Sequence, residues 1–220
     1  MSITDNLIEI KKKLPDHVRL IAVSKTKPAE CILELYQYGQ RIFGENRVQE
    51  ITEKYQQLPS DIEWHFIGHL QTNKVKFITP FISFIHSIDS LKLLNEINKE
   101  AQKNNRVINC LLEMYIATEE TKFGLDLSES IALLESPEYK KMNHIRICGV
   151  MGIATFTEDL TRVRNEFKNL ASYYNQIKTR YFSNQSYFKE ISMGMSNDYE
   201  IAIQEGSTLV RIGTSIFGSR

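Results

Sequence analysis

The chain has 220 residues, of which 42% are hydrophobic, 10% aromatic and 25% charged. This composition excludes collagen-like, low-complexity and wholly disordered proteins, and it is typical of one globular domain or two small ones. Because 27 Lys and Arg residues balance 27 Asp and Glu residues, the formal net charge is zero, and no global field gathers nucleic acid or an anionic membrane.

The chain opens with an amphipathic helix, predicted over 4–14, and continues as an alternation of short β-branched runs and segments of helical period. In chain order, strands are predicted at 19–25, 41–45, 64–68, 83–87, 107–115, 145–151, 189–194 and 208–213. The helices that follow them are predicted at 28–39, 46–57, 72–78, 90–104, 127–136, 158–180 and 197–205.

Eight strands that alternate with helices predict parallel pairing through right-handed crossovers, and such units can close into a (β/α)₈ TIM barrel. The alternative is an open doubly wound sheet, but no Gly-x-Gly-x-x-Gly motif follows the first strand. No linker divides the chain, so we expect a single domain over 1–220. Only 214–220 follow the last strand, too few residues for an eighth helix, and we expect the helix at 4–14 to cover the flank left bare.

Chemistry in such a barrel is expected at the carboxyl ends of its strands. Lys25 ends the first strand and Arg211 lies in the eighth, and closure of the barrel makes these strands neighbours. Two cations at one mouth repel each other unless an anion lies between them or the lysine is neutral. The pair therefore predicts either a bound anion or a neutral lysine at this mouth.

A phosphate site is predicted beside these cations. The segment 192–198, Ser-Met-Gly-Met-Ser-Asn-Asp, leads from the seventh strand into a helix, so its backbone amides and the Ser196 hydroxyl can converge on a phosphate. Gly213 and Thr214 provide a second turn at the adjacent strand end, and loops after strands seven and eight often bind phosphate. A lysine, an arginine and a phosphate cradle at one mouth are suited to pyridoxal 5'-phosphate (PLP).

Seven motifs resemble those of the pyridoxal phosphate homeostasis protein family, in the family's order and from about residue 19 to the end of the chain. They are Ala-Val-Ser-Lys-Thr-Lys-Pro at 22–28, Phe-Gly-Glu-Asn at 43–46, Trp-His-Phe-Ile-Gly-His-Leu-Gln-Thr-Asn-Lys at 64–74, His-Ser-Ile-Asp-Ser at 86–90, Lys-Phe-Gly at 122–124, the segment 192–198, and Val-Arg-Ile-Gly-Thr-Ser-Ile-Phe-Gly at 210–218.

The resemblance implies the fold of the alanine racemase amino-terminal barrel and a role for each matching residue. It makes Lys25 the Schiff-base lysine and Arg211 the partner of the pyridine nitrogen, and it places Asn46 and Met151 around the ring. The phosphate ligands that it implies are Ser196, Gly213 and Thr214.

The function that the family implies is to carry and buffer PLP as a lysine aldimine and to maintain its intracellular level, with PLP-dependent apoenzymes as partners. The alternatives are enzymes, either a PLP-dependent amino-acid racemase or a Schiff-base aldolase. Arg211 argues against strong catalysis, because a guanidinium cannot accept a proton from the pyridinium and so weakens the cofactor as an electron sink.

Other features predict the setting of this protein. His65, His69 and His86 lack a carboxylate or cysteine at matching spacing, so we expect hydrogen-bonded wall residues and no metal site.

The sequence also predicts where the protein lies. It contains no run of about 20 apolar residues that could span a membrane, and charges interrupt the first 14 residues, where a signal peptide needs an apolar run. The three cysteines are widely spaced and fit no disulfide framework. We therefore expect a cytoplasmic protein, and a monomer, because a closed barrel has no free sheet edge.

Overall fold

The computed structural model describes residues 2–117 and 123–218. Within them, eight parallel strands pair in sequence order and close into a barrel. The strands are β1 (Arg19–Val23), β2 (Ile42–Glu45), β3 (Glu63–Phe66), β4 (Phe84–Ile88), β5 (Ile108–Glu113), β6 (Ile145–Met151), β7 (Glu190–Ser192) and β8 (Leu209–Ile212). The predicted (β/α)₈ barrel is confirmed, and the open doubly wound alternative is wrong.

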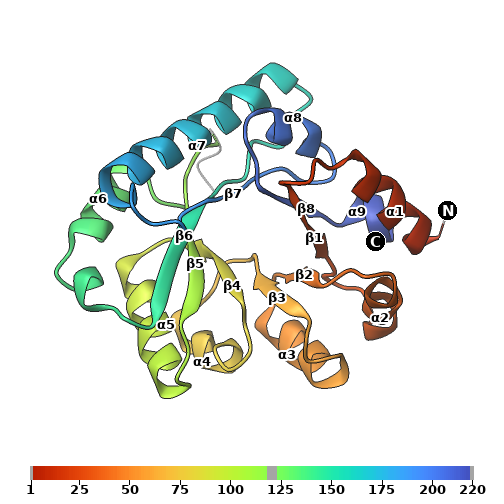
Figure 1. Cartoon of the computed structure of the whole chain (residues 1–220), viewed down its shortest axis with the longest axis horizontal. Helices are drawn as coiled ribbons and strands as arrows, with labels where there is room; N and C mark the ends of the chain where they lie inside the picture. Colours follow the sequence, from red (N-terminus) through yellow and green to blue (C-terminus); the bar gives the residue numbers. More distant parts are fainter. Residues whose placement is uncertain (1, 118–122, 219–220) are drawn as a thin grey trace.

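Helices surround the ring of strands (Figure 1). They are α1 (Ile3–Lys13), α2 (Ala29–Gln37), α3 (Val48–Gln57), α4 (Val75–Ile78), α5 (Leu91–Lys103), α6 (Leu127–Glu135), α7 (Leu160–Tyr181), α8 (Tyr199–Gln204) and α9 (Thr214–Phe217), with short 3₁₀ turns η1 (Thr72–Lys74) and η2 (Tyr139–Lys141). The helix predicted at 72–78 is thus divided into η1 and α4, and the four-residue α9 was not predicted.

The flank beside β1 and β8 is covered by the amino-terminal helix, as predicted. Ser2 and Asp5 form a reciprocal capping box that starts α1. The helix lies beside α9 and next to α2 (Figure 1). It buries Leu7, and Asn6 Nδ2 donates to the carbonyl of Ile216 at 2.9 Å. The first and last described segments therefore close this side of the molecule together.

Apolar side chains fill two regions, one between the strands and the helices and one inside the ring. The outer region contains the largest buried rings, among them Trp64, Phe43 and Phe66. Inside the ring, one cluster packs the six side chains of Ile21, Phe84, Leu111, Cys148, Met151 and Leu209. Strands buried on both faces explain why the sequence shows continuous apolar runs in place of alternation.

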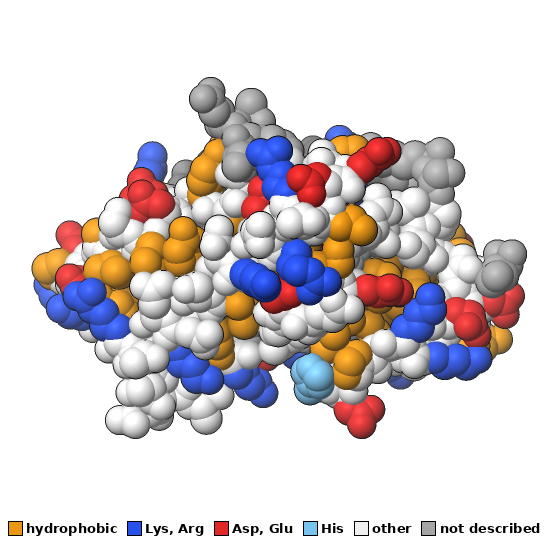
Figure 2. All heavy atoms as spheres, turned by 90° about the horizontal axis from the view of Figure 1, so that it is seen from above, with side chains coloured by type: hydrophobic (Ala, Val, Ile, Leu, Met, Phe, Trp, Pro, Cys, Tyr) orange, Lys and Arg blue, Asp and Glu red, His pale blue; other side chains and the backbone are white. Residues whose placement is uncertain are grey.

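Charged side chains of both signs are interspersed with apolar ones over the face shown in Figure 2, without a large region of one sign. This distribution agrees with the balanced composition. Among the helices of the described residues, none combines the length and the apolarity needed to cross a bilayer.

Candidate functional site

A cavity of about 510 Å³ opens at the carboxyl ends of the strands. Six of the seven predicted site residues line it. They come from the loops after β1, β2, β7 and β8, from β8 itself and from the start of α9: Lys25, Asn46, Ser196, Arg211, Gly213 and Thr214. The pairing of Ile21 with Arg211 between β1 and β8 brings the two predicted cations to one mouth. The structure therefore assembles Lys25 and the residues predicted to bind phosphate around one space.

The backbone around Lys25 is fixed on both sides, although its side chain is only half-buried. Before it, the Ser24 N–H donates to the carbonyl of Gly44, and the Ser24 hydroxyl donates to Glu45 Oε1 at 2.6 Å. After it, Thr26 has a φ of +64°, a left-handed conformation that costs a β-branched residue energy. The Thr26 N–H donates to Glu50 Oε1, which compensates for this conformation.

A buried charge cluster anchors this segment from outside the ring. Lys54, on α3, donates to the carbonyl of Ser24 at 2.9 Å and to Glu45 and Glu50 at 2.7 Å each. Burial raises the pKa of Glu45, and the neighbouring Lys54 ammonium opposes this effect. Sequence analysis did not predict this cluster, hereafter the Lys54 cluster. Its one signal is that Lys54 follows the buried Ile51 by three residues, which places a cation on the apolar face of the helix.

Arg211 is fixed through its side chain. It is only 4% exposed, and Nη1 donates to the carbonyl and the hydroxyl of Ser192 at 2.8 and 2.7 Å, while Nη2 donates to the carbonyl of Gly152 at 3.0 Å. A guanidinium has five N–H donors, so five minus three leaves two, one on Nη2 and the one on Nε, without an acceptor among the described residues. Burial lowers the pKa of Arg211 to about 10, and the group remains a cation at neutral pH.

The loops after β7 and β8 meet at the cavity. Ser196 Oγ accepts a long hydrogen bond of 3.4 Å from the Ser215 N–H, and Gly213 and Thr214 lie beside it on the cavity wall. Gly194, with a φ of +93°, begins the loop, and a Cβ there would lie 2.6 Å from that of Ala202. Only glycine fits this close approach of the loop to α8. The hydroxyl and turns predicted to bind phosphate are thus adjacent.

Asn46 and Met151 occupy different environments. Asn46 lines the cavity, and its backbone carbonyl lies so close to Gly68 that a Cβ there would be 2.5 Å away. Met151 is buried in the apolar cluster inside the ring and does not line the cavity. The structure therefore brings Asn46 to the predicted site and leaves Met151 outside its lining.

One wall of the cavity was not predicted. It consists of residues 153–157 and the start of α7, including the exposed Phe156 and Leu160. Thr155 donates from its N–H and its hydroxyl to the buried carboxylate of Glu166 at 2.6 and 2.7 Å. The sequence signal was weak, because a carboxylate on a long surface helix ordinarily faces water.

Glu113 ends β5 in a buried position close enough to Asp89 and Arg211 for their charges to act on it. Its Oε2 has no hydrogen-bond partner in the part of the chain that the structure describes. Burial, together with the negative charge of Asp89, raises the pKa of Glu113 to about 7. A carboxyl group that titrates near neutrality thus lies close to the buried guanidinium.

The three histidines of the predicted wall separate into two kinds. His65 and His86 are fully buried and hydrogen-bonded, as predicted, whereas His69 is partly exposed, pairs with Asp89 at 3.2 Å and stacks on Phe123. In residues 2–117 and 123–218, no three His, Cys, Asp or Glu side chains form a metal-binding group. Lys122 of the Lys-Phe-Gly motif lies outside the described residues.

Comparisons with known proteins match the whole chain. The family model described as alanine racemase, N-terminal domain, matches residues 1–220. A pyridoxal phosphate homeostasis protein of Aquifex aeolicus is 43% identical over 204 residues, which cover 92% of this chain and 87% of the relative. The human protein of the same name is 40% identical over 214 residues, covering 92% of this chain and 76% of the relative.

A solved structure agrees with these relatives. PipY of Synechococcus elongatus PCC7942, determined with PLP bound, is 34% identical, and its fold matches with a TM-score of 0.89 over 99% of this chain and 100% of PipY. The sequence matches and the fold lead to the same assignment. This chain belongs to the alanine racemase N-terminal domain family and, within it, to the pyridoxal phosphate homeostasis proteins.

Proposed function

We propose that this chain binds PLP in the cavity at the carboxyl ends of the strands, and carries and buffers it so that its intracellular level is maintained. One observation carries the proposal. A buried arginine with two N–H donors that no described residue accepts lines the same cavity as the Lys25 amine. A cation so buried is costly unless a ligand completes its hydrogen bonds.

The residues that line the cavity fit the chemical groups of PLP. The Ser196 hydroxyl and the turns at Gly213 and Thr214 provide donors for a phosphate, and Lys25 provides an amine for an aldehyde. The unclaimed donors of Arg211 suit the lone pair of a pyridine nitrogen. Asn46 borders the space where the ring would lie. The volume of about 510 Å³ is that of an ordinary small-molecule site.

When bound, PLP supplies an aldehyde that condenses reversibly with amines and a ring that can accept electrons. Arg211 limits the second property, because it donates hydrogen bonds and cannot take a proton from the ring nitrogen. An unprotonated ring is a weak electron sink. The site is therefore suited to holding and releasing the cofactor, and not to carbanion chemistry.

The relatives support the same function. Proteins named pyridoxal phosphate homeostasis protein share 36–43% of their residues with this chain, and PipY was solved with PLP bound. We extend both properties to this chain, with PLP-dependent apoenzymes as the recipients. We also propose that it acts as a single unit over 1–220 and as a monomer, which size-exclusion chromatography with light scattering tests directly.

Borohydride trapping tests the assignment of Lys25. The purified protein incubated with PLP should show a visible absorption band, and reduction followed by peptide mapping should place the label on Lys25. Lys25→Ala should remove the band and leave weak binding through the phosphate. The matched control is Lys27→Ala, because Lys27 lines the same cavity but donates to the carbonyl of Phe217. A label on another residue of the wild-type protein would refute the assignment.

Activity assays separate a carrier from an enzyme. We expect no racemisation over the common amino acids and no cleavage of phosphorylated sugars. Turnover that depends on Lys25 would show that the protein is a racemase or an aldolase and would contradict the carrier function. For the carrier, the informative measurement is restoration of activity to an apoenzyme by the loaded protein.

A further inference from the structure

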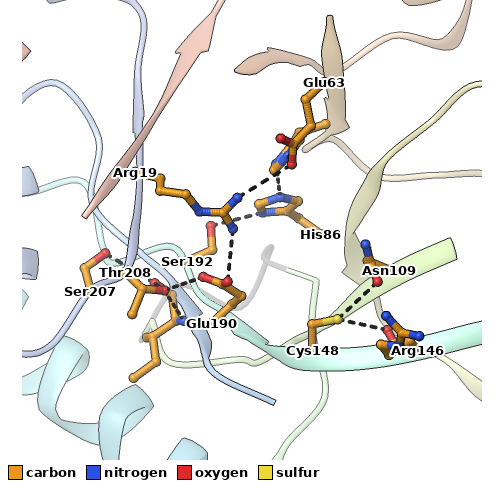
Figure 3. Close-up of polar contacts among 12 residues, drawn as sticks. Arg19, Glu63, His86, Asn109, Arg146, Cys148, Glu190, Ser192, Ser207 and Thr208 are labelled. Atoms are coloured by element: carbon orange, nitrogen blue, oxygen red, sulfur yellow. Dashed lines mark hydrogen bonds and ion pairs between the residues drawn. The ribbon is translucent and has the colours of Figure 1, made fainter. Parts of the chain in front are cut away.

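Beneath the cavity, the interior of the barrel holds a row of polar side chains that the proposed function does not use, and all of them except the partly exposed Glu63 are buried. They come from three different strands: Glu63 and His65 from β3, His86 from β4 and Ser192 from β7. His86 Nδ1 lies 3.0 Å from Ser192 Oγ, and His86 Nε2 lies 2.9 Å from His65 Nδ1. His65 Nε2 lies 3.0 Å from Glu63 Oε1. Figure 3 shows Glu63, His86 and Ser192 approaching one another across the barrel.

The row continues to Arg211 at one end and ends in a charge group at the other. Ser192 Oγ lies 2.7 Å from Arg211 Nη1, at the base of the cavity. At the far end, Arg19 contacts Glu63 at 3.6 Å and Glu190 at 3.0 Å (Figure 3). All three residues begin their strands, so they belong to the opposite mouth of the barrel. The hydrogen bonds thus connect the two mouths.

The chemistry of the Glu63 end, together with neutral histidine rings, sets the direction of every hydrogen bond in the row. Glu63 only accepts, so His65 donates to it from Nε2. A neutral His65 then accepts at Nδ1 from His86 Nε2, and a neutral His86 accepts at Nδ1 from the Ser192 hydroxyl. The Ser192 oxygen keeps a lone pair for Arg211, which only donates. With both rings neutral, a single arrangement satisfies all four contacts.

Both rings are held in the neutral state that this arrangement requires. His65 and His86 are fully buried, and burial lowers the pKa of each. The hydrogen bond from His65 lowers the pKa of Glu63 and keeps it an acceptor. A protonated His86 would donate from both nitrogens, and the Ser192 hydroxyl would lose its acceptor.

We propose that His65, His86 and Ser192 form a directional hydrogen-bond chain that positions the Arg211 guanidinium, with Glu63 fixing the direction of the chain from the opposite mouth. The chain holds Nη1 away from the cavity and so leaves the donors on Nε and Nη2 for the ligand. Because a guanidinium has no acceptor, no proton passes from the chain to the ligand. These are positioning residues, and their relevance to PLP rests on the proposed function.

The histidine tautomers test the chain without PLP. Long-range ¹H–¹⁵N spectra of the uniformly labelled full-length protein, with ring signals assigned through His65→Gln and His86→Gln, should show both rings neutral and protonated on Nε2. Either ring protonated on Nδ1, or as an imidazolium at neutral pH, overturns the proposal. This readout uses the folded wild-type protein and does not depend on tolerance of a substitution.

Ser192 variants test the effect on Arg211. Ser192→Ala removes one acceptor from a charged donor, so PLP affinity should fall at least about tenfold, and His86 Nδ1 should lose its hydrogen-bond donor. Ser192→Thr keeps the hydroxyl and should restore both. The matched control is Ser207→Ala, another buried serine, which donates to backbone carbonyls of Ile191, Met193 and Leu209 and not to the chain. Equal affinity in Ser192→Ala and wild type overturns the proposal.

The outcomes also separate the two proposals. If the wild-type protein fails to bind PLP, the proposed function is wrong, and the tautomers still decide whether the chain exists. If PLP binds and the tautomers differ from those expected, only the hydrogen-bond chain is wrong.

Discussion

The two cations of the cavity are held in opposite ways. The segment that carries Lys25 is fixed from outside the ring, where the Lys54 cluster binds the backbone and side chains of its neighbours. Arg211 is fixed from inside the ring, where the hydroxyl and the carbonyls of Ser192 and Gly152 bind the guanidinium itself. One support holds a backbone and the other holds a side chain.

The difference matches the tasks proposed for the two residues. An amine that forms and releases a covalent bond needs a side chain that can move while its Cα stays in place. A cation that only recognises a ring nitrogen gains from a side chain fixed before the ligand arrives, because less entropy is lost on binding. The substitutions below separate these two supports.

Loss of Lys54 should have the largest effect. Lys54→Met leaves Glu45 buried without its cation, and breaking a buried pair in this way costs about 3–5 kcal/mol in the free energy of unfolding. Urea denaturation measures the loss. The double variant Lys54→Met/Glu45→Gln should recover much of it, and Lys12→Ala, which removes an exposed pair with Glu9, should cost no more than about 0.5 kcal/mol. A small effect of Lys54→Met would contradict the anchoring role of the cluster.

The Glu113 carboxyl should make stability depend on pH on the Arg211 side. Its folded-state pKa of about 7 exceeds the ordinary value of 4.5, so the folded protein binds the proton more tightly than the unfolded chain. This contribution is fully present below pH 4.5 and is lost as the pH rises through 7, and it amounts to about 3 kcal/mol.

Glu113→Gln should therefore remove this dependence. Urea denaturation of both proteins between pH 4 and 8 should show wild type losing about 3 kcal/mol relative to the variant. Parallel stability curves would show that Glu113 titrates no differently in the folded protein and the unfolded chain.

Two glycines with similar backbones test the loop after β7. Gly194→Ala and Gly206→Ala both place a Cβ at a positive φ, which costs about 1–2 kcal/mol. Only the Cβ at Gly194 would collide with Ala202, and overpacking of this kind adds about 1–3 kcal/mol. PLP affinity should fall in Gly194→Ala, whose loop carries Ser196, and stay near that of wild type in Gly206→Ala. Equal PLP affinities in the two variants would show that the loop after β7 does not contribute to phosphate binding.

Met151→Leu should have the smallest effect. Its side chain packs inside the ring and does not line the cavity, and the substitution nearly conserves volume. PLP affinity measured by titration should be unchanged within about twofold, or about 0.4 kcal/mol. Asn46→Ala, which alters the cavity wall itself, should weaken binding measurably. A strong effect of Met151→Leu on PLP affinity would support the contact between Met151 and the ring that the family resemblance implies.

The barrel could be predicted because its strands are buried on both faces, so each apolar run is visible by itself in the sequence. Lys25 and Arg211 could be predicted because the end of a strand fixes where a residue lies in a closed barrel. These inferences need only local pattern and topology. Met151 shows the limit of such inferences. The pairing of its strand, β6, with β5 shifts register between Cys110 and Leu111, and no local pattern in the sequence indicates such a bulge.

The supports of the site could not be predicted because they join distant segments. His86 and Ser192 are 106 positions apart, and their contact depends on the stagger of strands around the ring. The wall at 153–157 depends on Glu166, which shares the apolar face of α7 with Val163 and is buried there although a carboxylate ordinarily faces water. Tertiary packing determines the contacts of these residues, and a single sequence contains little information about that packing.

The pairing of β1 with β8 has a consequence for synthesis of the protein. Ile21 and Arg211 are 190 positions apart (211 minus 21), so at typical translation rates about 10 to 40 seconds separate their appearance on the ribosome. A nascent chain therefore lacks half of the binding site until β8 has been synthesised. A fragment that ends before β8 would be unable to hold the vitamin between the two strands.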